Sequence, residues 1–255
     1  MIAKTFAAVF VVLGLGFAAS PAIAQEDVPL TPKQVDGVRK IVRDYLMEHP
    51  EVIGEAIEAL REKMRLQAEA DAKKSIDAYK EELFNGKDDP VAGNPKGDVT
   101  LVEFFDYNCP FCKQSMEPLL DAVKADGKVK VVFKEFPILT DDSMVASRVA
   151  LAAKKQGKYD EVYRAFMKYR GQLDEKAIWR LAAEAGVNVD QARKDAASPE
   201  IQKQIRRNQE IAHALDIGGT PTFIVGDHIL SSALDQGGFK QLFESARKGT
   251  PQPQQ

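Results

Sequence analysis

Apolar residues recur at helical spacing along the first part of the chain. Between Thr31 and about Asn85 they return every three or four positions on a charged background, which is the pattern of amphipathic helices. Pro50 divides the pattern, because the residue before a proline avoids helical geometry and a proline is tolerated near a helix start. The sequence therefore predicts two helices around Pro50. From Arg61 to Lys80 large apolar residues become scarce, so we expect this part to be helical but mostly solvated.

The apolar stripe of these helices needs a surface to cover it, because the segment holds too few large apolar residues to form a core. One interpretation is packing against the rest of the same chain. The other, which we favour, is association with further copies, as in coiled coils. Residues 25–85 are thus predicted to be a helical N-terminal extension that makes the protein a homo-oligomer. Residues 86–98, dense in Gly, Pro, Asn and Asp, are predicted to be a linker of turns.

The pattern changes its period at Val99. Residues 99–105 are apolar with almost no alternation, which is typical of a strand buried on both faces. A helical pattern follows over 110–124 and a second strand over 129–133, so these segments predict a βαβ unit. Residues from about 142 to 215 then carry helical patterns and predict an inserted helical domain.

The last part of the chain returns to short strands. Residues 223–225 and 229–230 flank a Gly-Asp-His turn and predict a hairpin, and residues 239–247 predict a closing helix. The order βαβ, helical insert, ββα is that of the thioredoxin fold with an inserted helical domain. We therefore predict an α/β protein with this fold over residues 99–250, preceded by the helical extension.

The first 24 residues have the features of an export signal. Lys4 supplies a positive start, the 14 residues from Phe6 to Ala19 are apolar, and Ala22-Ile23-Ala24 has the small-x-small form of a cleavage site. An uncleaved anchor is the alternative, but a membrane span needs about 20 residues. We expect cleavage after Ala24, a periplasmic location, and a disordered tail over 251–255.

Charge and cysteine content narrow the class of protein. The chain has 255 residues, 44% of them hydrophobic, and a formal charge of −3 at pH 7. It lacks the basic excess that neutralises phosphates, so we expect no nucleic-acid partner. Its two cysteines, Cys109 and Cys112, lie three positions apart. A bridge across so small a loop stabilises little, which points to chemistry rather than to a structural disulfide.

The motif Cys109-Pro110-Phe111-Cys112 lies where a predicted strand gives way to a predicted helix. The sulfur of Cys109 then faces free N–H groups and the positive helix end, which favour a thiolate. Cys109 is the expected nucleophile, and Cys112, one turn further and less exposed, the resolving thiol. Structural zinc is an alternative, but it normally takes four ligands and the three His residues lie far from the motif in sequence. An inert bridge is another. The order strand, CxxC, helix favours redox work with no cofactor beyond the cysteine pair.

A second motif, Gly218-Gly219-Thr220-Pro221, directly precedes a predicted strand. Base rates favour a trans bond before any proline. Given the CxxC motif, we instead predict a cis Thr220–Pro221 bond beside Cys109, where the Thr220 backbone would bind an extended substrate peptide.

Glu103 is the third feature, six residues before Cys109 in an otherwise apolar strand. On its own it could be an edge residue that faces water. If it is buried, its pKa rises and it becomes a candidate proton acceptor for Cys112. Lys134, at the end of the neighbouring strand, is then a possible partner.

Four motifs together resemble the DsbA-like family of bacterial envelope thiol–disulfide oxidoreductases, over about Pro90 to Lys248. They are Val102-Glu103-Phe104-Phe105, Cys109-Pro110-Phe111-Cys112, Lys134-Glu135-Phe136-Pro137 and Gly219-Thr220-Pro221-Thr222. The resemblance implies a thioredoxin fold with a helical insert, with Cys109 as nucleophile, Cys112 as resolving thiol and Pro221 as cis-proline. With its extension, the chain looks most like the suppressor-of-copper-sensitivity C proteins. In some of these the extension assembles trimers that act as disulfide isomerases, so a trimer is the expected oligomer.

Two departures from the family's strong oxidants bear on the direction of reaction. Those oxidants carry His as the second residue between the cysteines, whereas Phe111 offers the thiolate neither a hydrogen bond nor a charge. Thr220 stands where the main oxidant has an aliphatic residue, and this resembles the isomerases. Both favour isomerisation of disulfides in cysteine-containing exported proteins. We expect Pro110 and Phe111 to lie beside the substrate. We also expect a membrane protein to be the redox partner.

Two rival functions stay open at this point. The same cysteine pair could hold Cu(I) as two soft thiolates, in a binding or copper-tolerance protein. Alternatively, the chain could be a structural oligomeriser in which the CxxC motif is incidental.

Overall fold

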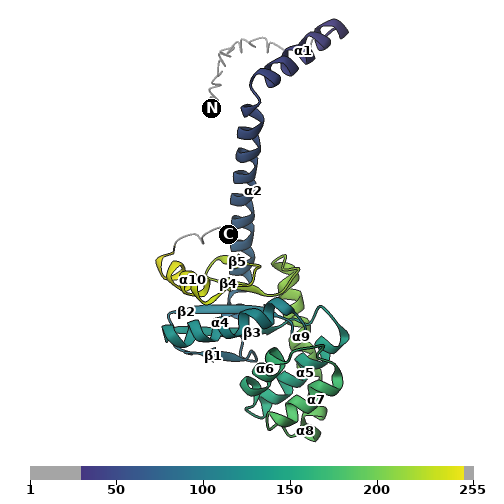
Figure 1. The fold of residues 1–255 in the computed structure, drawn as a ribbon, viewed down its shortest axis with the longest axis vertical. Helices are drawn as coiled ribbons and strands as arrows, with labels where there is room; N and C mark the ends of the chain where they lie inside the picture. Colours follow the sequence, from purple (N-terminus) through teal and green to yellow (C-terminus); the bar gives the residue numbers. More distant parts are fainter. Residues whose placement is uncertain (1–29, 250–255) are drawn as a thin grey trace, which may run out of the picture. The chain divides into compact units, whose positions relative to one another are not determined.

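The fold is described from a computed structural model, which covers residues 30–249. The predicted signal peptide, residues 1–24, and the predicted tail, residues 251–255, lie outside the described residues. The chain divides into two compact units with the boundary after Ala59, and each is described by itself (Figure 1).

The described part of the first unit is helical. Helix α1 (Pro32–Glu48) begins after Thr31, whose side chain accepts from the Gln34 N–H while Gln34 binds back to the Thr31 N–H. This reciprocal pair satisfies backbone groups that a helix start leaves free. Helix α2 (Glu51–Ala78) begins directly after Pro50, so the predicted break is confirmed. The large apolar side chains exposed on these helices include Val38, Ile41, Val42, Tyr45, Ile53 and Ile57.

The second unit is built around a five-stranded sheet with the strand order β1-β3-β2-β4-β5. Strands β2 and β3 are parallel and the other pairs are antiparallel. The strands β2 and β3 are completely or almost completely buried along their length, as the unbroken apolar pattern predicts. The strands are β1 (Val91–Gly93), β2 (Val99–Phe105), β3 (Val129–Glu135), β4 (Thr222–Val225) and β5 (His228–Leu230).

Strand β1 corrects one expectation. Residues 86–98 were expected to form only turns, yet Val91 pairs with Val132 of β3 and extends the sheet by one strand. Gly93 ends β1 with φ +73°, and a Cβ there would lie 2.4 Å from the Val129 oxygen. A strand this short among Gly, Pro and Asn leaves no alternating pattern in the sequence, because three residues hold less than two periods.

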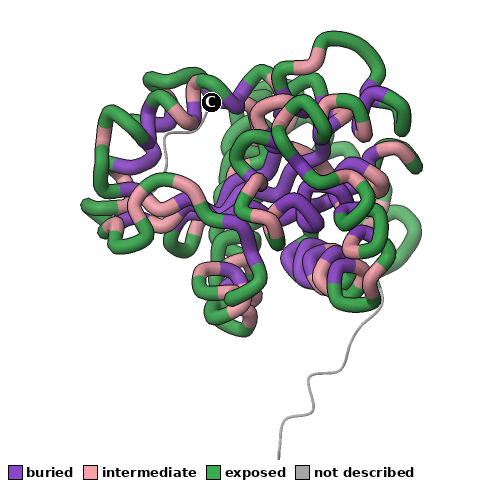
Figure 2. The backbone as a smooth tube through the Cα atoms, turned by 90° about the horizontal axis from the view of Figure 1, so that it is seen from below, coloured by how far each residue is buried: buried purple, intermediate pink, exposed green. Residues whose placement is uncertain are grey.

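Helices cover both faces of the sheet. On one face α4 (Pro110–Asp126) and α10 (Gln236–Lys248) pack over side chains such as Leu101 and Phe105. On the other face the packing over Val102 and Phe104 comes from α3 (Lys80–Asn85), the end of α2 and the end of α9 (Pro199–Ala214). Figure 2 shows the buried residues gathered in the interior between these layers.

The end of the predicted extension belongs to this second core. Ile76 of α2 and Leu83 of α3 are buried in the same cluster as Val102 and Phe104. The expectation of a mostly solvated helix as far as Lys80 is confirmed, and Ile76 is the one residue between Arg61 and Lys80 that is buried.

Five helices join β3 to β4 and confirm the predicted helical insertion. Four of them lie together to one side of the sheet, and the fifth runs back to it (Figure 1). They are α5 (Asp141–Lys155), α6 (Tyr159–Lys168), α7 (Glu175–Glu184), α8 (Val189–Ala196) and α9 (Pro199–Ala214). The architecture is the thioredoxin fold with a helical insert. Over residues 30–249, no helix is both long and apolar enough to cross a membrane.

Candidate redox site

The two cysteines lie at the junction that the sequence predicts. Strand β2 ends at Phe105, and Cys109 is the N-cap of α4, with its sulfur accepting from the Cys112 N–H at 3.4 Å. Pro110 occupies the first turn of the helix, where its missing N–H costs nothing. The helix start therefore supplies backbone donors to the sulfur of Cys109.

The two sulfurs have opposite acidities. Both cysteines are free thiols. Hydrogen bonding from the Cys112 side chain, helped by the Thr220 side chain and the N–H groups of Cys112 and Phe111, lowers the pKa of Cys109 to about 6 against the opposing effect of burial. Burial raises the pKa of Cys112 far above its usual range, and its hydrogen bond to Cys109 and the charge of Glu103 act in the same direction. At neutral pH the site thus combines a thiolate with a protonated thiol behind it.

Access to the site comes from the side of Cys109. Cys109 is 3% exposed and Cys112 is 0% exposed, so the predicted order of exposure is confirmed. Pro110 is exposed and Phe111 is 60% exposed. The motif therefore shows its two middle residues to solvent and holds its sulfurs beneath them.

The predicted cis bond is present. The Thr220–Pro221 peptide bond is cis, and the carbonyl oxygen of Thr220 lies 3.1 Å from the sulfur of Cys109. Thr222 follows at the start of β4, where its hydroxyl donates to the Gly219 oxygen at 2.9 Å. The chain thus brings Thr220 and Pro221 to Cys109 from a position more than a hundred residues away.

Glu103 is fully buried, so the interpretation as a water-facing edge residue is wrong. Tyr163 donates to its Oε2 at 3.4 Å, and Oε1 has no hydrogen-bond partner among the described residues. Burial, together with the charges of Cys109 and Glu135, raises the pKa of Glu103 to about 8 against the opposing effect of the hydrogen bond from Tyr163. Glu103 therefore lies close enough to the cysteines for the charge of Cys109 to raise its pKa and for its own charge to raise the pKa of Cys112.

Lys134 is not the partner of Glu103. In the parallel register Glu103 lies opposite Phe133 and Phe104 lies opposite Lys134, so the two charged side chains point to opposite faces of the sheet. Lys134 instead forms a buried ion pair with Asp89 and donates to the backbone oxygen of Glu82 at 2.6 Å. The sequence shows that both residues lie in strands, but it does not fix the register between them.

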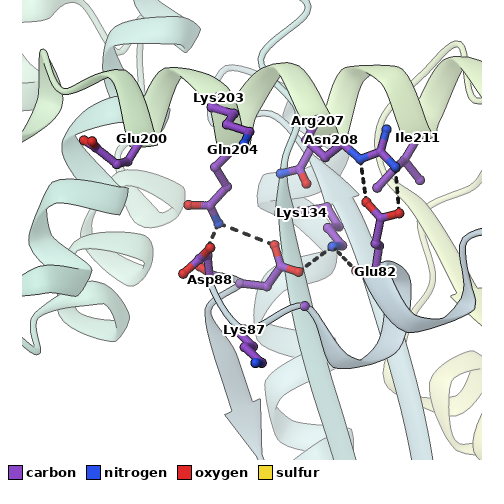
Figure 3. Close-up of a pocket in the computed structure, with 12 residues that line it drawn as sticks. Glu82, Lys87, Asp88, Lys134, Glu200, Lys203, Gln204, Arg207, Asn208 and Ile211 are labelled. Atoms are coloured by element: carbon purple, nitrogen blue, oxygen red, sulfur yellow. Dashed lines mark hydrogen bonds and ion pairs between the residues drawn. The ribbon is translucent and has the colours of Figure 1, made fainter.

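These contacts belong to a cavity of about 400 Å³ on the face away from the cysteines, between α3, β3 and α9. Figure 3 shows Lys134 reaching towards the loop before β1, with Arg207 of α9 binding the Glu82 carboxylate at its side. Gln204 donates to the Asp88 oxygen at 2.7 Å. The polar side chains here bind one another and tie α3 and its loop to the sheet.

A second buried carboxyl escaped the sequence analysis as a site residue. Glu135 is fully buried at the end of β3, and its Oε1 accepts from Tyr107 and Tyr159, each at 2.8 Å. Burial raises its pKa to about 8. Its signal in the sequence is an acidic residue at the end of an apolar run, within the Lys134-Glu135-Phe136-Pro137 motif.

The segment before Cys109 is fixed by hydrogen bonds to the helical insertion. The buried Asp106 carboxylate accepts from the Ser143 hydroxyl at 2.7 Å and from the N–H groups of Ile138 and Leu139 at 2.9 and 3.0 Å. The Asn108 side chain accepts from Leu173 N–H at 3.2 Å. The position of Cys109 is therefore set jointly by the sheet and the insertion.

Comparison with known proteins gives two domain matches. The model of the DSBA-like thioredoxin domain matches residues 100–244, and that of the copper resistance protein ScsC N-terminal domain matches residues 34–67. The chain is 30% identical over 155 residues to the thiol:disulfide interchange protein DsbA of Bordetella parapertussis. The aligned region covers 58% of this chain and 73% of that protein. The Na(+)/H(+) antiporter NhaA 1 of Mycobacterium sp. is a longer relative, 26% identical over 165 residues, of which this chain spans only 27%.

Solved structures agree with these matches. A thioredoxin-like oxidoreductase from Silicibacter pomeroyi is 40% identical with a TM-score of 0.64, covering 66% of this chain and 97% of that one. A linker-deletion mutant of Proteus mirabilis ScsC is 25% identical with a TM-score of 0.66, covering 88% of this chain and 100% of that one. The first domain match spans more than half of the 255 residues, and the chain belongs to the DsbA-like thioredoxin family.

Proposed function

We propose that this thiol–disulfide oxidoreductase of the DsbA and ScsC type isomerises disulfide bonds in exported proteins. The observation that carries the proposal is the contrast between its two thiols: the pKa of Cys109 is lowered to about 6, while burial raises that of Cys112. A thiolate is the nucleophile in thiol–disulfide exchange, and a second thiol close behind it can release a trapped substrate.

The reaction begins with attack by the Cys109 thiolate on one sulfur of a substrate disulfide. A mixed disulfide forms between Cys109 and that sulfur, and the other substrate sulfur leaves as a thiolate. In isomerisation the thiolate of another substrate cysteine then attacks the substrate sulfur that is bound to Cys109. Cys109 leaves as a thiolate again, so the substrate gains a rearranged disulfide with no net transfer of electrons.

Cys112 provides the escape route when isomerisation stalls. Its proton passes to the ionised Glu103 carboxyl, and the resulting Cys112 thiolate attacks the Cys109 sulfur. The bond to the substrate breaks, a substrate thiolate leaves, and the Cys109–Cys112 disulfide forms, so two electrons move to the substrate. Glu103 fits this role because it is buried, close to the pair, and has a pKa of about 8. The oxidised pair is then reset by a membrane redox partner, with no further cofactor.

Two residues favour isomerisation over one-way oxidation. Phe111 offers the Cys109 thiolate no side-chain hydrogen bond, so the reduced form lacks the extra stabilisation that makes a strong oxidant. Its 60% exposed ring and Pro110 offer an apolar surface to a substrate beside the sulfur. Thr220, with its carbonyl 3.1 Å from that sulfur, lies where an extended substrate peptide would pass next to Pro221.

The extension suits a homo-oligomer, for which we favour a trimer. Its exposed apolar side chains recur along α1 and the start of α2, and the match to the ScsC N-terminal domain covers these helices. Several active sites held in one particle would act on neighbouring disulfides of the same misfolded substrate. The features of the first 24 residues support export to the periplasm, where such substrates occur. No observation favours copper(I) binding, or a purely structural role, over redox work.

The function is tested by refolding a substrate with scrambled disulfides in a glutathione buffer. We expect the protein to restore native pairing catalytically, Cys109→Ser to abolish this activity, and Cys112→Ser to accumulate covalent complexes with substrate. Oxidation of a reduced substrate is measured in parallel, and we expect it to be slower than isomerisation. Lack of turnover with both substrates, or equal activity of Cys109→Ser, would contradict the proposal.

A further inference from the structure

A second buried carboxyl lies behind the redox pair and has no role in the reaction described so far. Glu135 is fully buried, and it accepts hydrogen bonds from Tyr107 and Tyr159, with the Ser147 side chain acting on it in the same way. Glu103 is also fully buried, and Tyr163 is its one hydrogen-bond donor among the described residues. Two carboxyls buried in one core point to a use that offsets the cost of burying them.

The two carboxyls share one face of the sheet. Glu103 lies opposite Phe133 in the parallel register, and Glu135 follows two residues later in the same strand. Because side chains two apart in a strand point to the same face, Glu103 and Glu135 are diagonal neighbours. The charge of Glu135 is one of the causes that raise the pKa of Glu103, which agrees with this placement.

Aromatic rings of tyrosines connect the two carboxyls. Tyr163 donates to Glu103, and Tyr159 donates to Glu135. The rings of Tyr159 and Tyr163 are stacked with their centroids 6.1 Å apart. Both phenols have pKa values raised well above the usual range by burial and by the nearby carboxylates, so they remain protonated donors. Water is therefore replaced around the carboxyls by a fixed layer of rings and hydroxyls.

The groups that face Glu135 come from every element packed on it. They are Tyr107 before α4, Ser147 of α5, Tyr159 and Tyr163 of α6, Glu103 of β2 and Asp106 directly after β2. Asn208 of α9 binds only the backbone oxygen of Glu135, at 3.1 Å. None of these groups is a cation, so nothing among them compensates two negative charges at once.

We propose, on the basis of the function proposed above, that Glu135 is a positioning residue that makes Glu103 a stronger acceptor for the proton of Cys112. Two carboxylates held close together in a site of low polarity cannot both ionise easily, so the pair retains one proton between its two members. When Cys112 gives its proton to Glu103, the Glu103 carboxyl becomes neutral and no longer repels a charge on Glu135. When the disulfide is reduced again, the proton returns from Glu103 to Cys112.

The direct test is the titration of Glu103 in the reduced protein, followed by carbon-13 NMR of its side-chain carboxyl and assigned with Glu103→Gln. Glu135→Gln keeps the size of the side chain and an acceptor for Tyr107 and Tyr159 while it removes the charge. We expect the midpoint of Glu103 to fall by about one pH unit in this variant. The equilibrium constant with glutathione, measured against pH, should change its slope at the correspondingly lower pH. Glu117→Gln, on the exposed side of α4, is the matched control and should change neither curve.

A second variant protects the test against loss of folding. Tyr159→Phe removes one hydroxyl that stabilises the charged form of Glu135, so it should move the Glu103 midpoint in the same direction by a smaller amount. An unchanged midpoint in both variants would overturn the inference. Failure of the native protein to equilibrate reversibly with glutathione would instead overturn the proposed function, while the NMR titration would still decide whether the carboxyls are coupled.

Discussion

Single residues differ in this site because of where each lies relative to one helix start. Cys109 is the N-cap of α4 and receives hydrogen bonds from Phe111 and Cys112. Cys112 lies within the first turn, fully buried against the core and next to the charge of Glu103. The same thiol chemistry is therefore acidic at one position and very weakly acidic three positions later.

The ionisation of Glu103 predicts a pH-dependent stability. A carboxyl whose pKa is raised on folding, here from 4.5 to about 8, adds its full share of stability below the unfolded value and loses it as the pH rises through the folded value. At about 1.4 kcal/mol per pH unit, the loss approaches ~5 kcal/mol at most. Glu103→Gln should therefore match the native protein near pH 5 and be more stable near pH 9.

Urea unfolding of the oxidised proteins at both pH values measures this difference without the thiolate of Cys109. A constant difference between native protein and variant across this pH range would show that Glu103 is not held protonated by burial.

The sequence identified most of the site, because its main residues occupy local patterns. A CxxC motif at a strand-to-helix junction, a Thr-Pro before a strand, and a lone Glu in an apolar strand can all be found from neighbours in the chain. The partner chosen for Glu103 was wrong because Lys134 depends on strand register, which is a tertiary property. Glu135 was missed as a site residue because its partners, Tyr107 and Tyr159, come together only in the folded protein.

At the scale of elements, the end of α2 and α3 form part of the core that supports the sheet. Ile76 and Leu83 are buried with Val102 and Phe104. The sequence did not predict this role, because two apolar residues in a charged helical stretch do not show which surface they cover. The sequence did not predict strand β1 for a similar reason, since its pairing with β3 is decided by tertiary contacts and not by its own three residues.

Two truncations separate the extension from the core. Deletion of residues 25–59 keeps Ile76 and Leu83, so we expect the remaining protein to unfold cooperatively with nearly native stability. Removal up to residue 85 deletes both side chains and exposes their cluster, at about 1.5–3 kcal/mol for each. Thermal unfolding of the two proteins tests this. Equal midpoints would show that the end of α2 and α3 are dispensable.

The ion pair between Lys134 and Asp89 predicts a further difference at this scale. Lys134→Ala leaves the buried Asp89 carboxylate without its cation, and breaking a buried pair on one side destabilises by about 3–5 kcal/mol. The double variant Lys134→Met with Asp89→Asn removes both charges and should be less destabilised than Lys134→Ala. Urea unfolding at neutral pH compares the three proteins. A double variant less stable than Lys134→Ala would contradict this explanation.

At the scale of the whole molecule, the apolar stripe of α1 predicts the oligomeric state. Ile41 is 69% exposed in the single chain. A charge there therefore hardly destabilises an isolated chain, but it strongly destabilises an apolar interface between chains. Ile41→Lys should reduce the mass measured by light scattering towards that of one chain, whereas Lys40→Gln, at the neighbouring exposed position, should not. The native mass of a single chain would contradict self-association.

The proposed chemistry requires that Cys109 is a thiolate at neutral pH while Cys112 stays a buried thiol. The rate of alkylation of the reduced native protein, followed against pH with mass spectrometry to locate the label, tests it most directly. We expect labelling of Cys109 alone, with a midpoint near pH 6. A midpoint near 9, the value of an ordinary cysteine, or equal labelling of Cys112, would contradict it.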